Sequence, residues 1–374
     1  MYCGCQSVPD WLYQWLLKNG ALILDIKNYL ENAINLGASD LFIVVGRPIS
    51  IRKTGQIIDM DNELISPAIS EELIWQIYDY AGRSFEHFKN YGDDDFSFAI
   101  PGISRFRVNC FKQRGTLSAV VRIISFSIPS YEELQIPPYV IELANTNKGM
   151  VLVTGPAGSG RSTTLACMVD SINKRSSKHI ITLEEPLEFL HKHDKSIVNQ
   201  REINVDTDSY ATALRAALRQ SPDVILLGEI CDCETVGLSI TAAQMGHLLL
   251  SSLDTLGAAN AVAHIINAFP DGEQNQIAVQ LSMVLNAVVY QQLVPTIDGG
   301  QTLAVEVMTV TPAIRNMIRN NKINQIKDTI YMSSADNMIS MDKSLLALFR
   351  KGRISKDTAI RCSVNPEHLE QLLA

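Results

Sequence analysis

The sequence predicts an α/β protein in two parts, a smaller mixed α+β domain followed by a larger domain in which helices cover a parallel sheet. Three observations lead to this fold class. After residue 148, apolar strand-like segments alternate with helical ones, as in parallel sheets. A glycine-rich loop joins the first of these strands to a helix. Before residue 128, short strands and helices lead into a proline-containing stretch that is typical of a linker.

The composition is that of a globular protein without a nucleic-acid surface. Of the 374 residues, 46% are hydrophobic and 19% are charged. The net charge of −8, with no basic stripe, argues against nucleic acid as a partner. No C-x-x-C pair and no suitably spaced histidine accompanies the cysteines, so we expect reduced thiols in a cytoplasmic protein and no zinc site; the cysteines are Cys3, Cys5, Cys110, Cys167, Cys231, Cys233 and Cys362.

Residues 1–23 form an N-terminal extension of uncertain status. Their apolar residues recur at helical spacing from Trp11 to Leu17, but the apolar core is shorter than the ~18 residues that a membrane helix needs. The segment also lacks a basic start, so a secretory signal is not expected. Two interpretations remain open: a small docking helix, or a start codon chosen upstream of the true one.

Residues 24–127 are predicted to form the smaller domain, and residues 128–147, with Pro129, Pro137 and Pro138, the linker. Helices are expected at 25–36 and 70–80 and strands at 41–45, 49–52, 57–58, 96–100, 105–109 and 119–123. In the larger domain, residues 148–374, we expect strands at 150–154, 179–183, 224–227, 247–253 and 302–308, helices at 162–174, 207–220, 235–245 and 312–320, a helix or a buried strand at 281–292, and a helical tail at 341–369.

The loop after the first strand of the larger domain carries the clearest chemistry. It fulfils the phosphate-binding pattern G-x-x-x-x-G-K-[ST] at every position except one, where Arg161 replaces the lysine. Glycines let consecutive N–H groups point inward, and the helix N-terminus adds partial positive charge. Ser162 is placed to hold Mg²⁺. The predicted phosphate-binding residues are Gly155, Pro156, Ala157, Gly158, Ser159, Gly160, Arg161, Ser162 and Thr163.

Two further strands end in carboxylates. Residues 223–229 form an apolar strand that delivers Glu229 to the edge where ligands bind in α/β sheets, which suits Mg²⁺ or the attacking water. Residues 180–188 end in Glu184, Glu185 and Glu188, which could orient water or metal; the alternative is a solvated turn. His247 opens another strand, either as a structural residue or as a γ-phosphate sensor.

Arginines alternate along neighbouring strands of the smaller domain. They are Arg105, Arg107, Arg114 and Arg122. Guanidinium groups presented in this way suit an anion across an interface. The alternative is a solvated strand face.

With these residues in place, the chain resembles the secretion and pilus ATPase superfamily, most closely its type IV pilus retraction branch. The resemblance covers the chain from about residue 24 to its end. It rests on segments 37–41, 104–109, 199–202 and 213–219 together with the glycine-rich loop and the Glu184, Glu229 and His247 motifs. The four-cysteine zinc insertion of the assembly and type II secretion members is missing, and residues 311–319 are similar to a helix characteristic of retraction motors.

The resemblance implies a PAS-like domain followed by a RecA-like ATPase domain, in a hexameric ring that binds ATP and Mg²⁺ between the domains. Glu184 would polarise water, Glu229 would serve the second motif and the metal, and His247 would sense the γ-phosphate. Arg107, Arg114 and Arg122 would be candidates for anion contacts. The implied partners are further copies or a paralogue, and an inner-membrane pilus platform protein, at the cytoplasmic face of that membrane.

The departures from the family pattern lie in the active site. Arg161 stands for the loop lysine, Asp254 for the second histidine of the histidine motif, Cys231 for an arginine, and Gln244-Met245 for Glu-Thr. A planar guanidinium directs its donors differently from an ammonium, and an acid at 254 would repel phosphate unless metal intervenes. Two functions therefore stay open: a pilus-retraction ATPase with weakened catalysis, and a non-hydrolysing nucleotide-binding or structural partner of an active paralogue in a pilus or type II secretion system.

Overall fold

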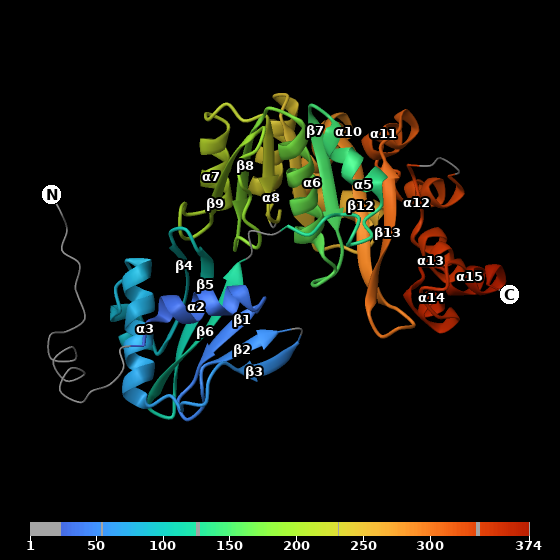
Figure 1. The fold of residues 1–374 in the computed structure, drawn as a ribbon. Helices are drawn as coiled ribbons and strands as arrows, with labels where there is room; N and C mark the ends of the chain where they lie inside the picture. The colour runs from blue at the N-terminus through green and yellow to red at the C-terminus, as the bar shows by residue number, and fades with distance from the viewer. Residues whose placement is uncertain (1–23, 54, 125–127, 231, 334–336, 374) are drawn as a thin grey trace. The chain divides into compact units, whose positions relative to one another are not determined.

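The structure is a computed structural model that describes residues 24–53, 55–124, 128–230, 232–333 and 337–373. The predictions for residues 1–23 and for Cys231 lie outside these residues. The chain forms two compact units that divide after residue 126, and each is described by itself (Figure 1).

The first unit is an α+β structure, as predicted. Its six strands form one sheet in the order β3-β2-β1-β6-β5-β4, and every neighbouring pair is antiparallel. Alternate residues of the strands, such as Phe106 and Val108, face a single core that the helices cover. The elements are α2 (Ile26–Asn35), β1 (Asp40–Ile43), β2 (Ser50–Lys53), β3 (Gln56–Asp59), α3 (Pro67–Ala81), α4 (Glu86–Tyr91), β4 (Asp93–Ile100), β5 (Ser104–Gln113) and β6 (Thr116–Ile124).

Local sequence signals explain the bounds of the long helix α3. The hydroxyl of Ser66 accepts a hydrogen bond from the N–H of Ile69 at the start, and Pro67 occupies the first turn, where its missing N–H costs nothing. The helix ends at Gly82, whose φ of 58° is the left-handed conformation that glycine adopts most easily. Its buried residues Leu73, Ile74 and Ile77 recur at helical spacing and pack into the core.

The second unit is an α/β domain built on a seven-stranded sheet in the order β13-β12-β7-β11-β10-β8-β9. All its pairs are parallel except β12 with β13. The elements are α5 (Pro138–Glu142), η1 (Leu143–Asn145), β7 (Gly149–Thr154), α6 (Arg161–Arg175), β8 (His179–Glu184), β9 (Ile197–Glu202), α7 (Tyr210–Ala217), β10 (Val224–Leu227), α8 (Cys233–Gln244), β11 (Leu248–Leu253), α9 (Ala258–Asn267), α10 (Asp271–Val284), β12 (Leu285–Pro295), β13 (Gln301–Thr309), α11 (Pro312–Arg319), α12 (Ile323–Met332), α13 (Met341–Arg350), α14 (Lys356–Cys362) and α15 (Pro366–Leu372).

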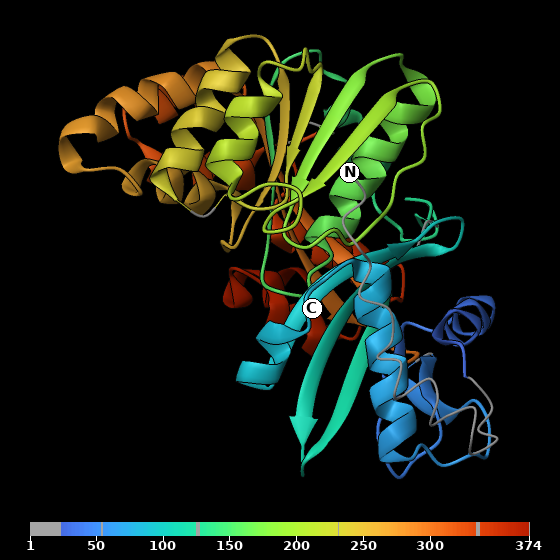
Figure 2. The same cartoon turned by 90° about the vertical axis from the view of Figure 1, so that its left-hand side faces the viewer.

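Helices cover both faces of this sheet, which confirms the predicted fold class. One face packs against α5 and α6, and the other against α7 to α12, so two apolar cores flank the strands. Figure 2 shows the sheet between α6 and the helices of the opposite side. Strands buried on both faces explain why β7 and β10 are continuous apolar runs without a polar alternation. A smaller third core joins α13, α14 and α15 to the β12–β13 pair.

The segment predicted as a linker belongs to the second unit. Within residues 128–147, the buried side chains of Ile136, Val140 and Ile141 join the core beneath α6, and α5 and η1 form there. The prediction relied on three prolines, but Pro138 stands at the first position of α5, where proline favours a helix start. The 281–292 segment, which could have been helix or strand, is divided: α10 ends at Val284 and β12 begins at the next residue.

None of the described helices combines the length and the apolar character that crossing a membrane would require.

Candidate nucleotide-binding site

The parallel register brings four loops to one edge of the second sheet. Leu253 lies opposite Thr154, so the loop after β7 and the residues after β11 leave the sheet side by side. Leu227 pairs with both Leu183 and Ser251, so the ends of β10, β8 and β11 are also level. This carboxyl edge is where ligands bind in open α/β sheets. It therefore collects residues 155–160, Glu184, Glu229 and Asp254.

The glycine-rich loop has the backbone geometry that a phosphate cradle needs. Gly158 and Gly160 have φ of 77° and 86°, a conformation that other residues adopt with strain. At Gly155, an added Cβ would lie 2.3 Å from the carbonyl oxygen of Gln291, so only glycine fits there. No side chain caps the N-terminus of α6 at Gly160. The first N–H groups of α6 and its positive dipole end are thus available to an anion.

A buried glutamine, which sequence reasoning missed, holds this loop in place. The Nε2 of Gln291 on β12 donates a 2.7 Å hydrogen bond to the carbonyl of Ser159, and its Oε1 accepts one of 2.9 Å from Thr164. Gln291 is fully buried, so the two bonds are shielded from water and link the loop and α6 to the sheet. The available signal was that Gln291 and Gln292 interrupt an apolar stretch between residues 287–290 and 293–294.

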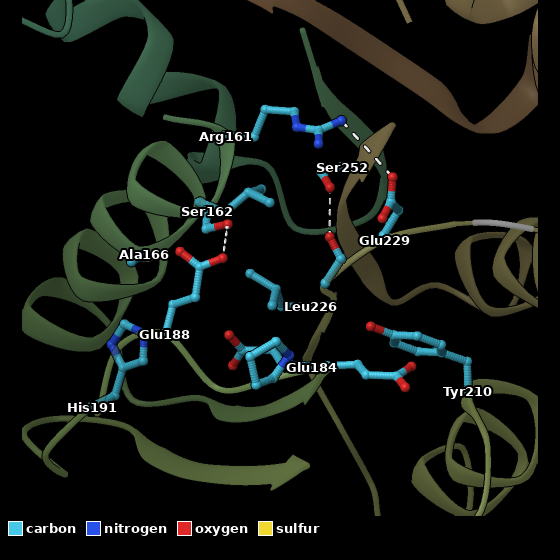
Figure 3. Close-up of a pocket in the computed structure, with 14 residues that line it drawn as sticks. Arg161, Ser162, Ala166, Glu184, Glu188, His191, Tyr210, Leu226, Glu229 and Ser252 are labelled. Atoms are coloured by element: carbon cyan, nitrogen blue, oxygen red, sulfur yellow. Dashed lines mark hydrogen bonds and ion pairs between the residues drawn. The ribbon is translucent and has the colours of Figure 1, made fainter. Parts of the chain in front are cut away.

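A cavity of about 110 Å³ lies between α6 and the ends of β8 and β10. Its lining includes Arg161, Ser162, Glu184, Glu188 and Glu229, so the structure brings these residues together (Figure 3). The Ser162 hydroxyl donates a 2.8 Å hydrogen bond to a carboxylate oxygen of Glu188. Hydroxyl and carboxylate oxygens are the hard ligands that Mg²⁺ prefers, so the donor set fits this ion. Ser162, with Glu229 across the cavity, would hold it.

The guanidinium of Arg161 faces the carboxylate of Glu229 at the edge of this cavity (Figure 3). Its Nη1 lies 3.6 Å from Oδ1 of Asp254 and 3.9 Å from Oε1 of Glu229. The Arg161 side chain is 15% exposed, whereas those of Glu229 and Asp254 are 40% and 60% exposed. Among the described residues, the buried Nη1 has no hydrogen-bond partner. This nitrogen is therefore held by charge rather than by a directional hydrogen bond.

Hydroxyl groups of β11 hold Glu229 at this edge. Ser251 donates to the carbonyl of Leu227 at 2.9 Å, and Ser252 donates to that of Gly228 at 2.6 Å. The N–H of Ile230 returns a hydrogen bond to the carbonyl of Ser252. The backbone on either side of Glu229 is thus hydrogen-bonded to β11, which holds this residue at the sheet edge.

Glu184 ends β8 and points into the cavity (Figure 3). Loss of solvation raises its pKa from near 4.5 to about 7, and the nearby charges of Glu188 and Glu202 act in the same direction. The side-chain amide of Gln200 on β9 donates to Glu184 at 3.4 Å and to the carbonyl of Phe189 at 2.9 Å. A carboxylate that titrates near neutrality is suited to take a proton from water.

His191 is a second cavity residue that the sequence did not reveal. Its backbone N–H donates a 2.7 Å hydrogen bond to Oε1 of Gln200. The residue lines the cavity together with Glu184 and Glu188 (Figure 3). Burial lowers the pKa of this imidazole to about 4, so the ring is neutral at physiological pH. It lies in an irregular segment after β8, where no periodicity marks a residue as buried.

His247 lies at the opposite end of its strand from the loop, so the predicted γ-phosphate contact does not fit its position in this chain. Its carbonyl accepts from the N–H of Gly149, the first residue of β7, whereas the loop follows the last residue of β7. The ring Nδ1 lies 2.8 Å from the carbonyl oxygen of Pro222. At about 3.3 Å per residue, the six residues of β11 separate His247 from the loop by roughly 20 Å. Asp254, which follows β11, reaches the site instead.

The arginines of the first unit are divided between two places. Arg107 and Arg122 are cross-strand partners in β5 and β6, which agrees with the prediction that these arginines lie on neighbouring strands. Each has an acidic partner: Arg107 donates to Asp95 at 2.7 and 3.0 Å, and Arg122 to Asp40 at 3.1 Å. Arg114, predicted on a strand, lies in the turn between β5 and β6 with φ of 50°. That turn is about 20 Å along the hairpin from the other two.

The parallel sheet with helices on both faces, the phosphate-type loop and the acidic residues at one edge define a RecA-like P-loop nucleotide-binding protein. The sequence model of the family described as "Type II/IV secretion system protein" matches residues 16–346. The chain therefore belongs to the type II/IV secretion system protein family, and within it to the pilus retraction branch.

Named relatives and a solved structure agree with this assignment. The chain is 46% identical over 276 residues to a twitching motility protein of Neisseria gonorrhoeae, which covers 74% of each chain. It is 39% identical over 346 residues to the type IV pilus retractation ATPase PilT of Pseudomonas aeruginosa, covering 92% of this chain and all of the relative. The crystal structure of the pilus retraction motor PilT with bound ADP superposes with a TM-score of 0.84 at 40% identity, covering 93% of this chain and 99% of the other.

Proposed function

We propose that the chain is an ATP-binding motor subunit that couples ATP hydrolysis to type IV pilus retraction, with weakened catalysis. One observation supports the binding step above all: the glycine-rich loop, braced by Gln291, presents the uncapped N-terminus of α6 beside the acidic cavity. The similar motor structure contains bound ADP, which supports nucleotide binding by this chain. The predicted residues 155–163 would then hold the phosphates.

The roles of the acidic residues follow from their positions. Bound Mg²⁺ would screen phosphate charge, and Ser162 and Glu229, which both line the cavity, are proposed to hold it. Glu184, whose pKa of about 7 leaves it partly ionised at neutral pH, is proposed to take a proton from water. Glu229 has a second role, because its carboxylate also attracts Arg161. His247 is left out of this mechanism because it lies at the far end of β11.

Weakened catalysis is proposed from the surroundings of Arg161. A loop lysine acts as a compact charge on the phosphates, whereas this guanidinium faces Glu229 and Asp254. Phosphoryl transfer depends on positioned charge, and one misplaced contact costs on the order of 10²-fold in rate. The same observation favours the second candidate, a non-hydrolysing partner of an active paralogue in a pilus or type II secretion system. The two differ only in whether turnover is measurable.

Membership of the retraction branch supports the assembly that we propose. Six copies, or copies of this chain with a paralogue, would form a ring at the cytoplasmic face of the inner membrane and act on a pilus platform protein. Residues 24–127 are proposed as the PAS-like domain. Arg107 and Arg122 are proposed to meet an anion there by exchanging their present acidic partners. Light scattering with and without ATP tests the ring, and a strict monomer in both would contradict it.

Nucleotide binding is tested by titration with a fluorescent ATP analogue in the presence of Mg²⁺. Gly155→Ala should abolish saturable binding, because its Cβ would collide with the carbonyl of Gln291 and distort the loop. Gly272→Ala on α10 is the matched control, since a Cβ there meets nothing within 4 Å. Circular dichroism establishes that both variants fold. Absence of binding by the unaltered protein at millimolar nucleotide would refute the proposal.

A further inference from the structure

The two charged residues that are unusual for this site meet in space. One guanidinium nitrogen, Nη1 of Arg161, lies 3.6 Å from Asp254 and 3.9 Å from Glu229. Both distances exceed those of charge-assisted hydrogen bonds, which are about 2.7–2.9 Å. The same nitrogen is buried and, within the described part of the chain, has no hydrogen-bond partner. Its donor capacity is thus unused although it is surrounded by negative charge.

The position of Arg161 would let this unused donor bind a phosphate instead of a carboxylate. Arg161 is the first residue of α6, directly after the uncapped Gly160. A phosphate at that helix end would lie beside the arginine's own backbone N–H and within reach of its side chain. Phosphate oxygens can form short, charge-assisted bonds to a guanidinium, which the two carboxylates do not form here. A phosphate bound there would therefore compete with the carboxylates for one cation.

The two carboxylates are not equivalent in this competition. The backbone beside Glu229 is hydrogen-bonded to Ser252 of β11 through Gly228 and Ile230, and Glu229 has the proposed metal role. Asp254 lies nearer to the guanidinium, is 60% exposed and makes no other ion pair among the described residues. Removing the charge of Asp254 therefore tests the pairing while leaving the carboxylate of Glu229 in place.

We propose that Asp254 is a positioning residue that holds the guanidinium of Arg161 and competes for it with a nucleotide phosphate. This inference rests on the proposed function. Binding of a nucleoside triphosphate then requires the exchange of the Arg161–Asp254 pair for an arginine–phosphate contact. Asp254 lowers affinity in two ways, because it retains the arginine and because it repels the phosphate. The first of these effects requires Arg161, and the second does not.

The pair itself is tested without nucleotide by the reaction of Arg161 with phenylglyoxal, followed by mass spectrometry of its peptide. The full-length protein is compared with Asp254→Asn and with Asp254→Glu, which keeps the charge. Asp328→Asn, an exposed charge change on α12, is the matched control. Of these variants, only Asp254→Asn should be labelled faster, by about fivefold. An effect of this size is what the loss of an exposed ion pair can supply. An unchanged rate in Asp254→Asn would overturn the proposal.

The competition is tested by a double-mutant cycle on the affinity for a fluorescent ATP analogue. We expect Asp254→Asn to tighten binding by roughly threefold to tenfold when Arg161 is present. The gain should be smaller in an Arg161→Gln background, where only the repulsion is relieved. A gain in that background as large as or larger than with Arg161 would show that Asp254 acts by repulsion alone and would overturn the proposal.

The two tests separate this inference from the function on which it rests. If the labelling rate responds as expected but no variant binds nucleotide saturably, the proposed function fails, and the competition fails with it, while the ion pair stands. If nucleotide binds but neither the labelling rate nor the cycle shows coupling, the proposed function stands and the role of Asp254 is wrong.

Discussion

The hydroxyl of Ser162, on the first turn of α6, donates a hydrogen bond of 2.8 Å to the carboxylate of Glu188 in the segment after β8. The bond joins the start of α6 to the acidic segment across the cavity. A serine that holds Mg²⁺ must turn an oxygen lone pair to the metal, and here its proton is already directed away to Glu188. In the proposed metal site, this direction leaves an oxygen lone pair of Ser162 for Mg²⁺.

From this bond we predict that Ser162→Ala removes most of the stimulation of nucleotide binding by Mg²⁺. The loss of a ligand oxygen should weaken the metal-dependent part of the affinity by roughly tenfold. Titrations with Mg²⁺ and with a chelator measure that part. Ser171→Ala, further along the same helix, is the control and should keep the full stimulation. Equal stimulation in both variants would remove Ser162 from the metal site.

Hydrolysis by the unaltered protein should be slow, and Arg161→Lys should raise it. Lysine would place a compact charge on the phosphates instead of a guanidinium that faces Glu229 and Asp254. Rescue should be partial, because Asp254 still repels phosphate, so Arg161→Lys with Asp254→His should exceed either single change. Steady-state phosphate release from the four proteins measures this. Turnover of the unaltered protein equal to that of a motor with the loop lysine would exclude weakened catalysis, and no gain in any variant would favour the non-hydrolysing partner.

The half-buried carboxyl group of Glu184 predicts a pH dependence of stability. The folded protein keeps this proton up to about pH 7, whereas the unfolded chain releases it near pH 4.5. Between these values the folded state binds more protons, so the free energy of unfolding falls as the pH rises and levels off above about pH 7. Allowing for solvent at this partly exposed residue, the fall is about 2 kcal/mol.

Urea unfolding of the unaltered protein and of Glu184→Gln between pH 5 and pH 8 tests this dependence. Glutamine cannot ionise, so the variant should lose the fall and be the more stable protein at pH 8. Glu273→Gln, an exposed change in the first turn of α10, is the control and should keep the fall. A parallel decline in all three proteins would assign the effect to other groups.

Gln291→Met should weaken both the fold and nucleotide binding. Methionine nearly conserves the volume but removes the bonds to Ser159 and Thr164, which leaves buried polar groups unpaired. We expect a loss of about 2–3 kcal/mol in the free energy of unfolding, and weaker nucleotide binding because the loop is no longer fixed. Denaturant unfolding and titration measure the two effects. Gln301→Met, at an exposed position of β13, is the control and should change neither stability nor nucleotide binding. If Gln291→Met also changes neither, the hydrogen bonds of Gln291 do not hold the loop.

The sequence by itself determined the class of the fold and most of the loop chemistry. Buried parallel strands are apolar throughout, helices repeat every 3.6 residues, and the glycine pattern of residues 155–160 is local. Each of these signals involves only a few neighbouring residues, so it can be recognised in the sequence without knowledge of the tertiary structure. Carboxylates that directly follow a strand, such as Glu184 and Glu229, could be assigned to the sheet edge for the same reason.

Only the tertiary structure decided which of these groups meet. Gln291, 132 residues from Ser159, reaches the loop because β12 pairs with β7, and no local pattern announces a pairing between distant strands. The direction of β11 placed His247 at one end of the sheet and Asp254 at the other, although both flank the same apolar run. The contact of Asp254 with Arg161 likewise depends on register, which is fixed by hydrogen bonds between strands and by packing on two faces.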